Sequence, residues 1–153
     1  MINTISKEDF LKLNEDNVMF ITNPGRMGDE DGSTFVIKEG SKYIIYRLDG
    51  WMYPSDLKDN ITLEDTKKQF PKWYEAWENC NDENFQGKYK YIYMGYGNGL
   101  CVDNRIYDTF KPFLDEKVNE YLSDKEDKES LKYAAIYNTW MDAFNDMTKK
   151  EDN

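Results

Sequence analysis

Mostly apolar side chains recur every three or four positions in three stretches of the chain, which is the spacing of an amphipathic helix. Thr62 and Asp65 stand at the start of the first stretch and match a helix cap. Pro71 interrupts this stretch, and because proline lacks a backbone donor we predict a kink or two abutting helices there. The three faces consist of Leu63, Thr66, Phe70, Trp73, Trp77 and Cys80; of Ile106, Phe110, Phe113, Leu114, Val118, Tyr121 and Leu122; and of Tyr133, Ile136, Tyr137, Trp140, Phe144 and Met147.

Shorter runs of β-branched and aromatic residues predict two β-hairpins. In the first hairpin, a Glu-Gly-Ser turn separates residues 34–38 from residues 42–48. In the second, residues 88–94 alternate lysine with aromatic residues, and a glycine-rich segment connects them to residues 100–103. We place the tight turn of this second hairpin at Asn98-Gly99, in the type I′ geometry that such a pair favours.

Two weaker signals complete the order of elements. Ser6 resembles the cap of a short helix that ends at about Leu13, and residues 18–21 form a short strand. Because helices and strands do not alternate as βαβ units, this order is typical of an α+β fold. We expect a single domain over residues 1–148, with an antiparallel sheet built from hairpins and three to four helices that cover one face. Residues 149–153 are expected to form a frayed tail.

The composition narrows the chemistry, because the 153 residues include no histidine. Histidine is the side chain most often used for proton transfer near neutral pH, and it is the commonest metal ligand. We therefore expect a protein that is not an enzyme and that holds no metal or cofactor. The 4 Trp, 12 Tyr and 8 Phe residues indicate a packed core, in which we place Trp73, Trp77 and Trp140.

The charge suggests a class of partner. The chain has 30 acidic and 20 basic residues and a net charge of −10, and no segment forms the basic stripe that a phosphate backbone requires. We expect neither nucleic acid nor an anionic membrane as a direct partner. A basic protein suits this charge, although solubility alone explains the acidity equally well.

The location inside the cell follows from the chain's beginning and its cysteines. Residues 1–20 lack the apolar run of a signal peptide, and no segment is apolar enough to cross a membrane. The sequence therefore predicts a cytoplasmic protein, with Cys80 and Cys101 as reduced thiols.

Two segments contain candidate partner-binding residues. Residues 91–100 have glycine at three alternate positions, and Tyr96 and Asn98 stand at the expected hairpin tip, where they would contact a partner. The spacing of these glycines matches no phosphate-binding loop. Asp29, Glu30 and Asp31 suggest calcium, but the twelfth position counted from Asp29 is a glycine, so an EF-hand does not fit. As an acidic loop, these three residues could enter a cationic cleft of a partner.

Two alternatives stay open. A pair of carboxylates could serve a small hydrolase, but among so many acidic residues a close pair has almost no specificity. Acidic pairs such as Asp115-Glu116 and Glu126-Asp127 permit a mimic of the DNA charge pattern. Cys101 stands between apolar residues and is expected to pack as one of them.

Taken as a whole, the chain resembles bacterial immunity proteins, which are small, acidic, single-domain proteins that bind and neutralise a toxin. The resemblance is one of size, charge and aromatic content, and no particular immunity family is assigned. It implies a cytoplasmic inhibitor that binds a basic protein partner such as a toxin. A phage-encoded inhibitor that acts in the same way is a closely related hypothesis.

Overall fold

The computed structural model describes residues 2–23, 33–48 and 61–151 of the chain. Within them, one six-stranded sheet has the strand order β1-β4-β3-β2-β6-β5. The strands are β1 (Ile2–Thr4), β2 (Val18–Asn23), β3 (Ser33–Glu39), β4 (Lys42–Leu48), β5 (Tyr89–Tyr93) and β6 (Gly99–Asp103). The helices are α1 (Lys7–Phe10), the 3-10 turn η1 (Glu15–Asn17), α2 (Leu63–Gln69), α3 (Pro71–Glu78), α4 (Asn104–Leu122) and α5 (Lys128–Glu151).

The predicted α+β class is confirmed, and so are both predicted hairpins. β3 and β4 pair antiparallel across a turn in which Gly40 has a φ of 60°, and β5 pairs antiparallel with β6. One pairing is parallel, because Ile2 of β1 lies opposite Ile45 of β4. This edge strand was not predicted.

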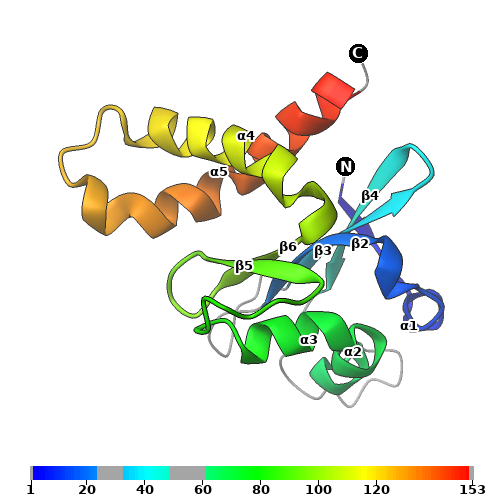
Figure 1. Ribbon diagram of the computed structural model, residues 1–153. Helices are drawn as coiled ribbons and strands as arrows, with labels where there is room; N and C mark the ends of the chain where they lie inside the picture. The colour runs from blue at the N-terminus through cyan, green and yellow to red at the C-terminus, as the bar shows by residue number, and fades with distance from the viewer. Residues whose placement is uncertain (1, 24–32, 49–60, 152–153) are drawn as a thin grey trace.

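The helices cover both faces of the sheet, so the expectation of a single covered face is wrong. Figure 1 shows α2 and α3 on one side of the sheet and the α4–α5 pair on the other. The buried side chains accordingly form two clusters. The first cluster includes Phe10, Phe35, Phe70 and Trp73, and the second includes Phe20, Phe110, Trp140 and Phe144.

The central strands explain why two layers of helices are needed. All five residues of β6 are buried, so this strand has no face left for solvent. In β2, Val18 and Ile21 join the first cluster, whereas Met19 and Phe20 join the second. A register shift between Val18 and Phe20 breaks the strict alternation, as a bulge does.

The local signals for helix ends operate as predicted. Thr62 and Asp65 form a reciprocal capping box at the start of α2. Pro71 stands at the start of α3, so the stretch divides into two abutting helices. Pro112 lies inside α4, which continues past it. α5 extends to Glu151, so helix includes residues 149–151, which we expected in a frayed tail.

Candidate functional site

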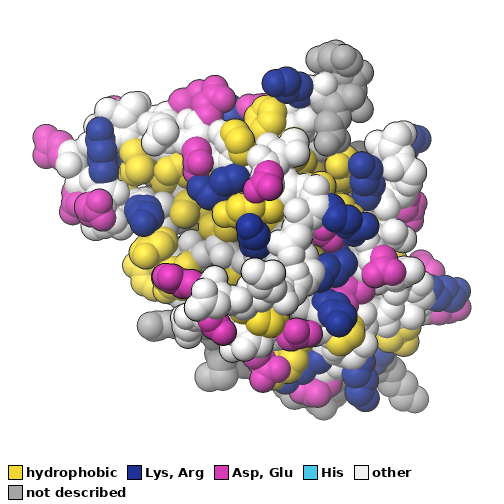
Figure 2. All heavy atoms as spheres, in the orientation of Figure 1, with side chains coloured by type: hydrophobic (Ala, Val, Ile, Leu, Met, Phe, Trp, Pro, Cys, Tyr) yellow, Lys and Arg dark blue, Asp and Glu magenta, His cyan; other side chains and the backbone are white. Residues whose placement is uncertain are grey.

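A groove opens between the β5–β6 hairpin and the first half of α5. Its volume is about 650 Å³, and Figure 2 shows hydrophobic side chains gathered at this place on the surface. We call it the aromatic groove. The hairpin contributes Tyr93, Met94, Gly95, Tyr96 and Asn98, and α5 contributes Ser130, Leu131, Tyr133, Ala134, Tyr137 and Asn138.

The aromatic groove contains an unusual concentration of exposed aromatic side chains. Across the described residues, five large hydrophobic side chains are exposed, and four of them are tyrosines of this groove. Tyr96 is 81% exposed, Tyr137 43%, and Tyr93 and Tyr133 41% each. The fifth is Leu11, which does not line the groove. Scattered exposed apolar residues are normal in proteins, but a gathered patch marks an interaction site.

The hairpin tip holds Tyr96 in a backbone conformation that tyrosine rarely adopts. Tyr96 has a φ of 52° and Gly97 a φ of 79°. The Asn98 N–H donates to the Gly95 carbonyl at 2.8 Å, and the Met94 N–H donates to the Asn98 carbonyl at 2.9 Å. This is the pattern of a type I′ turn with Tyr96 and Gly97 at its centre. The prediction that the turn lies at Asn98-Gly99 is therefore wrong.

The reason for this turn placement lies in the next strand. Gly99 belongs to β6, opposite Tyr93, and the Tyr91 ring packs over it so closely that a Cβ on Gly99 would collide with the ring. The lack of a side chain at Gly99 therefore leaves room for the Tyr91 ring. Gly97 supplies the positive φ that the turn needs.

Close packing fixes the hairpin against α5. The rings of Tyr93 and Tyr133 meet edge to face, with 4.8 Å between centroids and 65° between planes. A Cβ on Gly95 would lie 3.3 Å from the Tyr133 Cβ, so the hairpin backbone approaches the helix directly. The Tyr93 hydroxyl also accepts a bond from the Gly97 N–H at 3.4 Å. Contacts between the hairpin and α5 therefore hold the two sides of the groove in place.

The structure brings Tyr96 and Asn98 together at the aromatic groove, as two of the five predicted contact residues. Asp29, Glu30 and Asp31 lie outside the described residues. The prediction did not include Tyr133 and Tyr137, because their spacing assigned them to the buried face of the helix. They stand at the edge of that face, four residues apart, so they share a side of α5 that the hairpin only partly covers.

A second, polar groove of about 430 Å³ lies on another part of the surface, where α3, β5 and α4 begin. Asp103 lies beneath it with 1% of its side chain exposed, and its Oδ2 is 2.6 Å from the Lys88 Nζ and 2.9 Å from an Arg105 nitrogen. Burial alone raises the pKa of Asp103, but hydrogen bonds from Arg105 and Lys88 outweigh this and hold the pKa below its usual range. Burial lowers the pKa of Lys88.

Glu15 is a partly buried carboxylate that also attracts Lys88, and burial raises its pKa above the ordinary value. Its two oxygens accept bonds from the Lys72 and Trp73 N–H groups at 2.9 Å each, so Glu15 caps the start of α3. Asp103 similarly accepts from the Arg105 N–H at the start of α4. Opposite pKa shifts are one sign of an acid–base pair, yet both carboxylates here hold helix ends in place.

The cysteines and possible metal ligands complete the account of reactive groups. Cys101 is fully buried and burial raises the pKa of its thiol, so it packs as the apolar residue we predicted. Within the described ranges, no three Cys, Asp or Glu side chains gather as a metal site would require. None of the helices described has the length and apolar character needed to cross a membrane.

Comparison of the chain with protein-family models, curated proteins and solved structures yields no significant match.

Proposed function

We propose that this protein is a cytoplasmic inhibitor of the immunity type, which binds and neutralises a basic protein partner, such as a toxin, through the aromatic groove. The observation that carries this proposal is Tyr96, which is 81% exposed at a φ of 52°. Glycine or asparagine fits such a turn position without strain. A non-glycine residue at this position stores strain, and strain of this kind gathers at binding sites.

The surrounding tyrosines support the same function. Tyrosine is enriched among the residues that dominate binding energy, because it offers a large, rigid area with one polar end. Tyr93 and Tyr133 brace one another, so their rings are already ordered before a partner arrives. Preordered side chains lose less entropy on binding.

Charge supports a basic partner. A net charge of −10 speeds the encounter with a positively charged protein, and added salt screens this attraction. Glu15 and Asp103 do not favour the carboxylate-dependent hydrolase, because both accept hydrogen bonds from backbone N–H groups at a helix start.

Affinity capture from the native host tests this proposal, with the wild-type protein beside two variants. Tyr96→Gly removes the exposed ring from a position that glycine suits. Leu11→Ser is the matched control, because Leu11 is 50% exposed outside the aromatic groove. We expect wild type and Leu11→Ser to retain a basic protein that Tyr96→Gly loses.

The captured protein then allows a direct measurement. Its association rate with wild type should fall steeply between low and high salt, and its toxicity should be suppressed by co-expression of wild type but not of Tyr96→Gly. Equal capture by wild type and Tyr96→Gly, or the absence of a basic partner from both, contradicts the proposal.

A further inference from the structure

Ring faces and neutral polar groups line the aromatic groove. Among the residues that the structure describes, no Lys, Arg, Asp or Glu lines it. The face of an aromatic ring carries negative electrostatic potential and attracts cations. One contact of this kind lies at the edge of the groove, where the Lys132 Nζ is 5.7 Å from the centroid of the Tyr133 ring. Tyr96 and Tyr137 add two more exposed rings.

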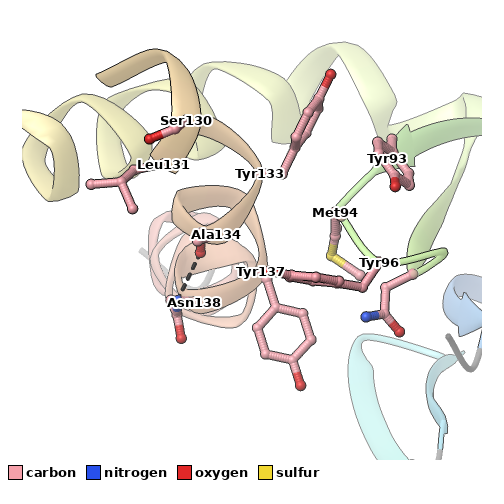
Figure 3. A pocket seen from close by; sticks show the side chains of 11 residues that line it. Tyr93, Met94, Tyr96, Ser130, Leu131, Tyr133, Ala134, Tyr137 and Asn138 are labelled. Carbon is pink, nitrogen blue, oxygen red and sulfur yellow. Dashed lines mark hydrogen bonds between the residues drawn. The ribbon is translucent and has the colours of Figure 1, made fainter. Parts of the chain in front are cut away.

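The polar atoms of the groove also favour a cation. The Asn138 side-chain N–H donates to the Ala134 carbonyl at 2.8 Å, so the donor end of this amide is engaged with its own helix. Its oxygen is the other end of the amide, and Figure 3 shows it directed away from Ala134. The groove therefore offers an oxygen acceptor beside its ring faces.

The charged side chains next to the groove stand at the start of α5. Hydrogen bonds from the Ser130 side chain and from the Ser130 N–H, the latter at 3.2 Å, lower the pKa of Asp127. Glu129, two residues further along the chain, is exposed. Lys128 and Lys132 balance these two carboxylates, and the carboxylates also oppose the partial positive charge at the start of α5, so a cation meets no net repulsion here and its attraction comes from the ring faces and the net charge of −10.

We infer that the aromatic groove receives an arginine side chain of the basic partner, an inference that rests on the proposed function. Arginine fits better than lysine, because its planar guanidinium stacks on ring faces and is weakly hydrated. Its five N–H donors can also reach oxygen acceptors around the rings. The volume of about 650 Å³ leaves room for the backbone that carries the arginine, and it lies within the range of known ligand pockets.

The test uses two short capped peptides, one with a central arginine between glycine and serine residues and one with citrulline in its place. Citrulline keeps the shape of arginine and removes the charge. Each peptide is titrated into the isotopically labelled full chain, and NMR follows the backbone amides of Tyr96, Gly97 and Asn138. We expect the arginine peptide to shift these amides and to bind roughly two- to fivefold more tightly than the citrulline peptide.

Variants separate the groove from the general attraction of an acidic surface. Tyr137→Leu and Tyr121→Leu both leave the charge of the protein unchanged, and Tyr121 does not line the groove. We expect Tyr137→Leu to abolish the preference for arginine and Tyr121→Leu to keep it, with far-UV circular dichroism to confirm that both are folded.

Equal binding of the two peptides, or arginine-induced shifts that map elsewhere and persist in Tyr137→Leu, overturns the inference. The two proposals fail differently. If partner capture depends on Tyr96 but the peptides bind alike, only the arginine assignment is wrong. If capture is independent of Tyr96, the proposed function itself is wrong.

Discussion

Lys88 and the buried Asp103 form a part-buried ion pair across the start of β5 and the end of β6, with 2.6 Å between Nζ and Oδ2. The Lys88 Nζ also donates to the Val18 carbonyl of β2 at 2.6 Å. One cation thus connects three neighbouring strands of the sheet. Arg105 approaches the same carboxylate from the helix side at 2.9 Å, so Asp103 has two cationic partners.

Removal of this carboxylate should destabilise the protein strongly. We expect Asp103→Ala to lower the free energy of unfolding by about 3 kcal/mol, because Lys88, with 14% of its side chain exposed, loses its hydrogen-bonded counter-charge. Urea denaturation measures the loss. Glu8→Ala is the control, since Glu8 and Lys12 form an exposed pair and such pairs contribute little. Similar losses in the two variants would contradict the role assigned to Asp103.

Acid should weaken the protein through the same group. The folded-state pKa of Asp103 lies below its ordinary value of 3.8. The unfolded chain therefore binds the proton first, and the stability due to ionised Asp103 is lost as pH falls from about 3.8 through the folded-state pKa. Denaturation in urea at a series of pH values should show this decline, and the decline should be shallower in Asp103→Asn. An equal slope in both proteins would refute the assignment.

Glu15 should have the opposite pH dependence. Its folded-state pKa is raised above 4.5 by burial, so its favourable contribution is complete below pH 4.5 and is lost as pH rises through the folded-state pKa. Glu15→Gln removes this titration and keeps one acceptor for the start of α3. Thermal unfolding between pH 4.5 and 7 should therefore change less with pH in Glu15→Gln than in wild type. A steeper dependence in the variant is the contrary result.

Tyr96→Gly should stabilise the isolated protein although it removes a large side chain. The φ of 52° costs a non-glycine residue about 1 kcal/mol, and the exposed ring gains little from burial. We expect the free energy of unfolding in urea to rise by roughly that amount. A decrease instead would mean that the Tyr96 ring packs productively in the free protein, and the strain argument would then be lost.

Two glycine substitutions can separate backbone strain from close packing. Gly95 and Gly40 both have positive φ, but a Cβ on Gly95 would meet Tyr133 at 3.3 Å, whereas a Cβ on Gly40 would have nothing within 4 Å. We expect Gly40→Ala to show only the backbone cost of about 1 kcal/mol. Gly95→Ala should lose more and should also shift the NMR resonances of Tyr133. Equal losses would show that the hairpin does not need its close approach to α5.

Local signals in the sequence determined where most helices and turns begin. The Thr62–Asp65 cap, Pro71 and the Gly40 turn act through neighbouring residues in the chain, so their effects can be predicted without the rest of the fold. The hydrophobic spacing similarly identified the three long helical stretches and placed Trp73 and Trp140 in the core. The sequence also shows that no histidine is present for proton transfer or metal binding.

The tertiary structure alone decided which sides of those elements meet. Val18 and Phe20 face opposite layers because of a bulge, and no periodicity in so short a strand reveals that. Tyr133 and Tyr137 belong to an amphipathic stripe, yet they stay exposed because the hairpin tip reaches only part of α5. Burial depends on what the rest of the chain places opposite a residue, and the aromatic groove exists only where β5, β6 and α5 come together.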